Sequence, residues 1–181
     1  MAWIIGDRII LRDYRKEDLP HMRKWVNDNE ITQYLSNIFL YPHTLNQTES
    51  FLNDILEGKN SYKGFVIAHK DTEEYIGQID LIKLDWVNRV ATMGIVIGAR
   101  EHLSKGYGKE AIKMLQDFVF NTLNLNKLDL EVIATNERAI RCYKKCGFIE
   151  EGRLREVRYI NGKYTDKMIM GILKSEYVAT T

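Results

Sequence analysis

Two glycines and two lysines lie together at the start of an amphipathic segment, in the sequence HLSKGYGKEAIKML (His102–Leu115). Gly106 and Gly108 let the chain turn with its backbone N–H groups uncovered by side chains. The following residues have the apolar spacing of a helix, whose first N–H groups are unpaired and carry the positive end of the helix dipole. Lys105 and Lys109 add positive charge. This combination is typical of a site for a phosphate-bearing molecule.

The glycine loop, as we call Leu103–Lys109, does not match the P-loop of nucleotide-binding proteins. That motif needs a glycine at the place of Leu103 and a Ser or Thr after its Gly-Lys pair, where this chain has Glu110. A strand-to-helix turn that uses its glycines for geometry alone is another interpretation, because glycine is the usual turn residue.

A dinucleotide fingerprint, G-x-G-x-x-[GA], does match GYGKEA (Gly106–Ala111). Such a fingerprint should follow a strand directly and open a repeated βαβ fold. The preceding strand is expected to end near Gly98, several residues too early, and antiparallel hairpins are expected before it. A loop for the pyrophosphate of coenzyme A is the remaining candidate.

A second group of residues lies in NERAIRCYKKCGF (Asn136–Phe148), which has the pattern of a helix with an Asn cap and a Gly end. Asn136 and Tyr143 are seven residues apart, so they share one helix face about 10 Å apart along the axis. Asn136 could bond an extended amide-bearing arm, with Tyr143 at the far end of the same groove. Alternatively, Asn136 only caps the helix and Tyr143 only packs.

The elements that must position these residues follow from periodicity and turn signals. Helices are predicted at Arg15–Glu30, Thr44–Gly58, Gly108–Leu123 and Asn136–Phe148, and strands at Asp7–Tyr14, Lys63–Lys70, Tyr75–Leu84, Asn88–Gly98, Lys127–Ile133, Glu156–Ile160 and Asp166–Leu173. The order predicts one α+β domain over residues 1–181, with a mostly antiparallel sheet and one parallel pair at 88–98 and 127–133.

The composition excludes several classes of protein. A net charge of +1 and a pI of about 7.7 give no global basic field for nucleic acid. Met1–Arg12 lacks the pattern of a signal peptide, and no window is apolar enough for a membrane span. Cys142 and Cys146 lie one helical turn apart, which suits two reduced thiols in the cytoplasm and offers no metal site.

With these motifs in place, the chain resembles the GNAT superfamily of N-acetyltransferases over essentially its whole length. The pyrophosphate loop of that family reads Q/R-x-x-G-x-G/A, and LSKGYG matches both glycines but not the first position, Leu103. The family's Asn, helix Tyr and Gly-Phe all occur, as Asn136, Tyr143 and Gly147-Phe148. The C-terminal half is similar to two branches, the ribosomal-protein N-terminal acetyltransferases and the spermidine/spermine acetyltransferases.

The resemblance implies a single GNAT-like domain whose parallel strand pair is splayed, with about four helices and with acetyl-CoA as co-substrate. Gly94, inside a strand, would mark the place where the pantetheine arm approaches the backbone. Tyr143 would be the catalytic acid that protonates the departing thiolate. The residues that the resemblance assigns to acetyl-CoA are Ile95, Val96, Ile97, Leu103, Ser104, Lys105, Gly106, Tyr107, Gly108, Lys109, Asn136 and Ala139.

The general base cannot be read from the sequence. Many relatives have a Glu where this chain has Thr92 and Met93, and Asp80 on the preceding strand is a candidate. A water chain is the alternative. The four histidines, which are scattered along the sequence, are given no role: His21, His43, His69 and His102.

The acceptor amine is judged from the two stretches where polyamine enzymes need carboxylates. Tyr34–Thr44 contains no acid, and Leu81–Trp86 has Lys83 where an acid would help. A less cationic acceptor is therefore expected, either a protein N-terminus or a small amine. Spermidine or spermine is the alternative acceptor, and a non-catalytic CoA-binding module is the alternative of another class. No nucleic-acid or membrane partner is expected, and a homodimer is one option for the oligomeric state.

Overall fold

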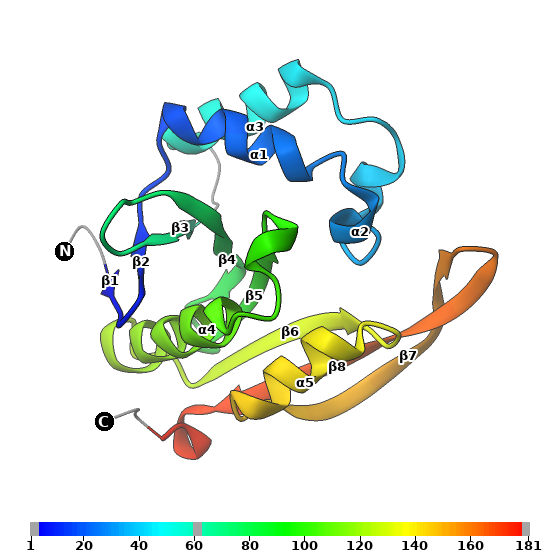
Figure 1. Cartoon of the computed structure of the whole chain (residues 1–181). Helices are drawn as coiled ribbons and strands as arrows, with labels where there is room; N and C mark the ends of the chain where they lie inside the picture. The colour runs from blue at the N-terminus through cyan, green and yellow to red at the C-terminus, as the bar shows by residue number, and fades with distance from the viewer. Residues whose placement is uncertain (1–3, 60–62, 179–181) are drawn as a thin grey trace. The chain divides into compact units, whose positions relative to one another are not determined.

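Eight strands and five α-helices occur in the part of the chain that the computed structural model describes, residues 4–59 and 63–178. The strands are β1 (Ile4–Ile5), β2 (Ile9–Arg12), β3 (Lys63–His69), β4 (Tyr75–Asp85), β5 (Val90–Ile97), β6 (Lys127–Ile133), β7 (Ile149–Ile160) and β8 (Lys163–Leu173). The helices are α1 (Leu19–Trp25), α2 (Asn29–Thr32), α3 (Leu45–Leu56), α4 (Tyr107–Asp117) and α5 (Glu137–Lys145), with α2 a single turn (Figure 1).

The strands form one mixed sheet in the order β1-β2-β3-β4-β5-β6-β8-β7. Strands β5 and β6 are parallel, with Val90–Thr92 paired to Lys127–Asp129. This register covers only the first part of both strands, as expected for a pair that separates. The predicted α+β class and parallel pair are confirmed, and the sheet is not the repeated βαβ arrangement that a dinucleotide fold requires.

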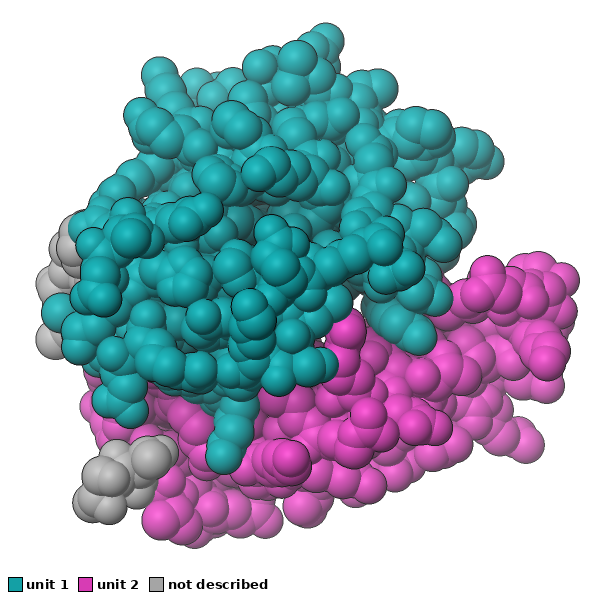
Figure 2. Space-filling model, viewed as in Figure 1, with its two compact units in different colours: residues 1–80, 95–111 teal, residues 81–94, 112–181 magenta. Residues whose placement is uncertain are grey.

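The chain divides into two compact units, shown in separate colours in Figure 2. Unit 1 comprises residues 1–80 and 95–111, and unit 2 comprises residues 81–94 and 112–181. Strands β4 and β5 therefore contribute residues to both units. The glycine loop belongs to unit 1, and α5 belongs to unit 2.

In unit 1 the helices α1 and α3 lie side by side (Figure 1). Thr44 begins α3 with a capping box, because its hydroxyl accepts a hydrogen bond from Gln47 N while the Gln47 side chain accepts one from Thr44 N. The apolar residues of these helices and of the neighbouring strands form a buried core: Ile10, Tyr14, Met22, Trp25, Val26, Ile31, Leu52, Val66, Ala68 and Tyr75. Val96 of β5 packs against this core.

In unit 2 the strand β6 alternates between buried and less buried side chains. Leu128, Leu130 and Val132 are buried, whereas Asp129 and Glu131 are not. The whole of β6 pairs with the second part of β8, Lys167–Leu173. Strands β7 and β8 form a long hairpin, drawn in orange and red in Figure 1. The end of α5 lies close to β8, because a Cβ added at Gly147 would come within 3.0 Å of Ile172 Cδ1.

Two predicted elements differ from the structure. The predicted helix over Arg15–Glu30 is interrupted, because Asp28 accepts a hydrogen bond from Glu30 N and caps a new turn, α2. The predicted strand over 156–160 is part of a longer strand, β7, which starts at Ile149. Its first half is exposed and charged at the sheet edge, so it lacks the apolar alternation that predicts a strand.

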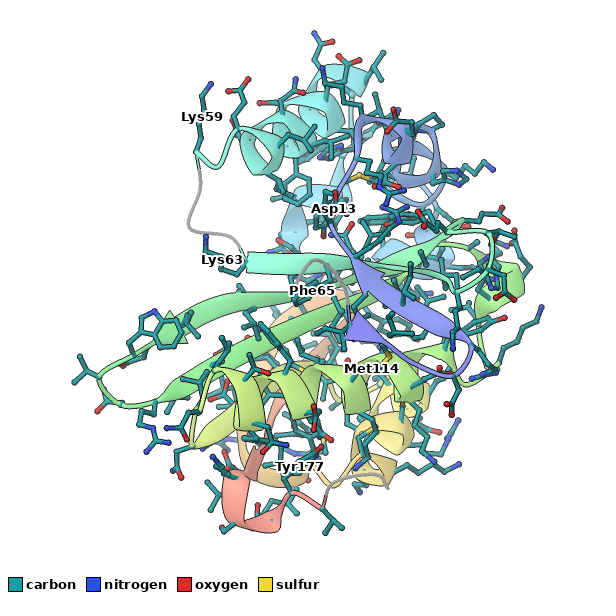
Figure 3. All side chains as sticks on the ribbon, turned by 90° about the vertical axis from the view of Figure 1, so that its left-hand side faces the viewer. Asp13, Lys59, Lys63, Phe65, Met114 and Tyr177 are labelled. Atoms are coloured by element: carbon teal, nitrogen blue, oxygen red, sulfur yellow. The ribbon has the colours of Figure 1, made fainter. Side chains whose placement is uncertain are left out.

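The C-terminal segment of unit 2 returns to the helix α4 and its continuation. Tyr177, labelled in Figure 3, donates a hydrogen bond to Asp117 Oδ1 at 3.1 Å, and its ring lies 5.1 Å from that of Phe120. Burial and the neighbouring carboxylate raise the pKa of Tyr177 to about 12. Among the described residues, no helix is long and apolar enough to cross a membrane.

Candidate functional site

The glycine loop has the backbone conformation of an anion-binding turn. Ser104 and Gly106 are both left-handed, with φ of 61° and 85°, and α4 begins at the next residue, Tyr107. When two left-handed residues are separated by a residue that is right-handed or extended, successive backbone N–H groups point toward the same side of the chain. The first N–H groups of α4 continue this row, because they have no partner within the helix.

Gly108 leaves open space beside the loop. A Cβ added at Gly108 would have Ile95 Cδ1 as its nearest neighbour, at 4.0 Å, which is an ordinary contact. The residue is not left-handed, so the backbone geometry does not require glycine here. The backbone at Gly108 is therefore open to a molecule that approaches it, which agrees with the prediction of a phosphate site.

The end of β5 that was assigned to the pantetheine arm lies in the same unit as the loop. Ile95 and Ile97 are half-buried, and Gly98 N donates to Ile76 O at 2.8 Å. A Cβ added at Gly77 would come within 2.2 Å of Val96 O, so Gly77 permits the close approach of β4 to this strand. The structure thus places Ile95–Ile97 and the glycine loop together in unit 1.

One residue that contacts the loop was missed by the sequence analysis. Arg8, which lies 97 positions before Lys105, donates a hydrogen bond from Nη1 to Lys105 O at 3.0 Å. It also forms an ion pair with Glu110 in the first turn of α4, with Nε 2.9 Å from Oε2. No local pattern in the sequence could have indicated this contact.

In unit 2 the Asn cap predicted for α5 is confirmed. Asn136 Oδ1 accepts a hydrogen bond from Ala139 N at 3.3 Å. No partner for Asn136 Nδ2 is found among the residues that the structure describes. The amide nitrogen is thus available to donate to a ligand carbonyl.

Tyr143 is half-buried on α5, with its ring 6.0 Å from that of Phe148 in an edge-on arrangement. Within the described ranges, no hydrogen-bond partner of its hydroxyl is found. Burial raises the pKa of Tyr143 above that of a free tyrosine, with smaller contributions from Cys142 and Cys146. The phenol is therefore protonated at neutral pH and able to donate.

The end of α5 that carries Tyr143 is held by three hydrogen bonds. Gly147 is left-handed, with φ of 91°, and Phe148 N donates to Tyr143 O at 3.1 Å. Gly147 N donates to Lys144 O, and the buried Gln116 donates from Nε2 to Cys146 O at 2.9 Å. These bonds satisfy the last carbonyls of the helix and so fix the backbone at Tyr143.

Asp80, the sequence candidate for a general base, is buried. Tyr14 OH donates to Asp80 Oδ1 at 2.7 Å, and Gln78 Nε2 lies 3.3 Å from Oδ2. The chain of hydrogen bonds continues from Gln78 to Tyr75 and Trp25. These bonds give Asp80 a structural function in the core of unit 1, and its role as a base stays a prediction.

Thr92 and Met93 occupy the strand position where many relatives have a Glu. Met93 is buried, whereas Thr92 donates from Oγ1 to Asp129 Oδ1 at 2.6 Å. Thr92 and Asp129 are the last pair in the parallel register of β5 and β6, and Met93 follows it. Asp129 is thus a carboxylate near the end of this register that the sequence analysis did not consider.

The segment Tyr34–Thr44 of unit 1 exposes apolar side chains. Ile38 is 62% exposed, Leu40 is 68% exposed and Tyr41 is 81% exposed. The segment is anchored by Arg23, whose Nη1 donates to His43 O at 2.7 Å and to Thr44 O at 3.0 Å. Arg23 thus places a cation against the C-terminal end of this segment.

The predicted site residues therefore fall into two groups. Unit 1 holds Ile95, Val96, Ile97 and the seven residues of the glycine loop, and unit 2 holds Asn136, Ala139 and Tyr143. Within the residues that the structure describes, no group of three or more His, Cys, Asp or Glu could hold a metal ion.

A comparison with protein-family models gives a match to the acetyltransferase (GNAT) domain over residues 8–149. This range includes β2 to β6, the glycine loop and the whole of α5.

Curated proteins and solved structures include relatives over nearly the whole chain. The chain is 33% identical over 175 residues to the spermidine N(1)-acetyltransferase of Vibrio cholerae, covering 96% of this chain and 98% of that protein. It is 33% identical over 169 residues to the corresponding protein of Escherichia coli, covering 93% and 88%. The crystal structure of the Vibrio cholerae spermidine N-acetyltransferase in complex with CoA and spermine matches with a TM-score of 0.82 and 32% identity, covering 94% and 98%.

Proposed function

Because this chain belongs to the GNAT family and is an acetyl-CoA-dependent N-acetyltransferase, we propose that its acceptor is a weakly charged primary amine. The acceptor is either the N-terminus of a protein or a small amine. The exposed apolar surface of Tyr34–Thr44, anchored by Arg23, is the observation that carries this proposal.

We assign the donor to the residues predicted from the sequence. The glycine loop takes the pyrophosphate, with its backbone N–H groups and with Lys105 and Lys109. The amides of Ile95–Ile97 pair with the pantetheine arm, and Asn136 donates from Nδ2 to one of its carbonyls. The left-handed residues of the loop and the open space at Gly108 support this assignment.

Acetyl-CoA supplies an acetyl group activated as a thioester. The amine nitrogen forms a bond to the carbonyl carbon and the C–S bond breaks, so the electron pair of that bond leaves with the sulfur. The amine must first lose its extra proton, because an ammonium has no lone pair, and solvent water accepts it. As the neutral amide forms, the nitrogen gives up a second proton, which also passes to solvent water. Strand N–H groups stabilise the charge that develops on the carbonyl oxygen. Tyr143 donates its hydroxyl proton toward the departing sulfur.

The acceptor assignment follows from charge. A polyamine carries several positive charges, and binding it requires carboxylates to replace the solvation that each charge loses. The Tyr34–Thr44 segment supplies apolar side chains and no acid. In the stretch Leu81–Trp86, Ile82 and Lys83 are exposed, and the one acid, Asp85, accepts hydrogen bonds from Asn88. An apolar surface is better suited to the side chains of a peptide or to a small amine.

Spermidine is the second candidate, and two observations favour it. Relatives at 33% identity are named as spermidine acetyltransferases. The less buried face of β6 and β7 in unit 2 also carries Asp129, Glu131 and Glu151. Two of these carboxylates are already paired, Glu131 with Lys167 at 2.8 Å and Glu151 with Lys127 at 2.6 Å, and Asp129 accepts from Thr92. We therefore rank spermidine below the weakly charged amines.

The ranking is tested by steady-state kinetics with acetyl-CoA in excess. Spermidine, a monoamine of similar length and a set of peptides with free N-termini are compared, with the same peptides N-terminally blocked as controls. We expect kcat/KM for the best peptide or monoamine to exceed that for spermidine by about tenfold, the scale of a single ion pair with the acceptor. A kcat/KM for spermidine above all of the others would assign the enzyme to the polyamine branch.

A further inference from the structure

We propose that Arg8 is a positioning residue for the cofactor, which holds the glycine loop in its binding conformation and neutralises Glu110 beside it. This inference rests on the proposed function, because it concerns the pyrophosphate of acetyl-CoA. Arg8 comes from the turn between β1 and β2 and was not part of any sequence motif.

Arg8 contacts the loop and the helix that follows it through four groups. Its backbone N–H donates to Glu110 Oε1 at 2.9 Å, and its Nε donates to Glu110 Oε2 at 2.9 Å. Its Nη1 donates to Lys105 O at 3.0 Å. The guanidinium carbon lies 4.9 Å from the centre of the Tyr107 ring, in a cation–π arrangement. A side chain at Gly106 would also meet the guanidinium, because its Cβ would lie 3.2 Å from Arg8 Nη2.

These contacts tie the glycine loop to the helix that follows it. Lys105 lies before the left-handed Gly106, and Glu110 lies in the first turn of α4 after it. Residues held on both sides of a left-handed position lose little entropy when a ligand binds, so the loop is preorganised for its ligand. The guanidinium fork can make such contacts because its N–H groups lie in one plane at fixed directions.

Arg8 is itself held by the turn on which it lies. Lys70 N donates to Arg8 O at 3.0 Å, and Gly6 N donates to Ile9 O at 2.9 Å. Lys70 Nζ donates to Gly6 O at 3.0 Å. The turn therefore provides a fixed support for the guanidinium, which is half-exposed on its solvent side.

Charge gives the second reason for the assignment. A carboxylate in the first turn of a helix is favoured by the dipole, as Glu110 is, and it competes with any anion that binds at the same helix end. Arg8 cancels the charge of Glu110 through the ion pair, so the positive charges of Lys105 and Lys109 prevail at the phosphates. Without Arg8, the carboxylate would repel the pyrophosphate.

Calorimetric titration with CoA tests both functions of Arg8. Arg8→Met keeps most of the side-chain volume, and we expect it to weaken CoA binding about tenfold, the scale of one partly exposed charged contact. Glu110→Gln alone should bind CoA as well as the wild type. The double variant Arg8→Met/Glu110→Gln should recover part of the lost affinity, because the carboxylate that Arg8 neutralises is absent. The remaining loss reports the bond from Arg8 Nη1 to Lys105 O, which the double variant also lacks.

Two controls separate positioning from a general loss of structure. The first control is Arg153→Met in unit 2. The Arg153 side chain is 47% exposed, close to the 51% of Arg8, and it pairs with Glu150 and Asp166. This variant should bind CoA normally. With S-acetyl-pantetheine, which lacks the pyrophosphate, kcat/KM should be the same for Arg8→Met and the wild type. Thermal unfolding of each variant shows that it is folded at the assay temperature.

The outcomes are distinguishable. Wild-type affinity for CoA in Arg8→Met would overturn the inference and leave the proposed function intact. A double variant as weak as Arg8→Met would contradict the neutralisation of Glu110, and an equal loss with S-acetyl-pantetheine would contradict a function at the pyrophosphate. Failure of the wild type itself to bind CoA would overturn the proposed function and this inference together.

Discussion

Replacing Tyr143 by Phe should lower kcat about 100-fold while the affinity for acetyl-CoA changes less than about twofold. The ring and its edge-on contact with Phe148 are retained, so only the hydroxyl is lost. A group that acts only when charge develops on the sulfur contributes to kcat and not to ground-state binding. The measurements are steady-state kinetics on the best acceptor and calorimetry with CoA.

The expected decrease of about 100-fold in kcat is at the low end of the range for loss of an acid catalyst. Burial raises the pKa of Tyr143, whereas a thiol has a pKa of about 8.5, so complete proton transfer from the phenol is uphill. The hydroxyl therefore stabilises the developing thiolate mainly as a hydrogen-bond donor. Tyr177→Phe, the same change in the same unit, is the control and should leave kcat unchanged. A kcat for Tyr143→Phe within about twofold of the wild type would remove the acid role, because that ratio is under 0.5 kcal/mol.

Gly106→Val should weaken CoA binding by about 5- to 150-fold without a change in helix content by far-UV circular dichroism. Gly106 has φ of 85°, and holding a non-glycine residue in such a conformation costs about 1–3 kcal/mol. The new side chain would also lie against Arg8 Nη2. Both effects move the loop away from the conformation that faces its N–H groups toward the ligand.

Two matched variants show which of these causes acts. Gly162, at the tip of the β7–β8 hairpin, has φ of 80° and no atom within 4 Å of an added Cβ, so Gly162→Val carries the strain alone and should bind CoA normally. Gly108→Ala has neither strain nor a contact with Arg8, yet its methyl group points into the open space beside the loop. It should also weaken CoA binding, and normal affinity in both loop variants would place the pyrophosphate elsewhere.

Much of the fold could be predicted because its signals are local. The helix α5 has an Asn cap, an apolar stripe and a left-handed Gly end, and each of these features depends on residues a few positions apart. The turn at Asn161–Gly162 has an equally local signal, since both residues are left-handed, as a two-residue hairpin requires, and Asn-Gly is the usual pair there. The start of β7 could not be found, because Glu150, Glu151 and Arg153 show no apolar alternation at the sheet edge.

The candidate site was predictable only where its residues are close in sequence. The glycines of the loop, and Asn136 with Tyr143, have a spacing that can be recognised. The contact between Arg8 and Glu110 joins residues 102 positions apart, and the bond between Thr92 and Asp129 depends on the register of two strands. The burial of Asp80 and its hydrogen bond with Tyr14, 66 positions away, have no local signal in the sequence either.

Release of free thiol from acetyl-CoA, followed together with the mass of the acceptor, tests the central claim most directly. The wild type is incubated with acetyl-CoA and one acceptor at a time. The acceptors are a peptide that has a free N-terminus, its blocked form, a monoamine and spermidine. We expect thiol release with the free peptide or the monoamine, one thiol for each acetyl group transferred, little release with spermidine and none with the blocked peptide. Thiol release with spermidine but with none of the other amines would contradict the account. So would the absence, with every amine, of thiol release above the rate of acetyl-CoA hydrolysis.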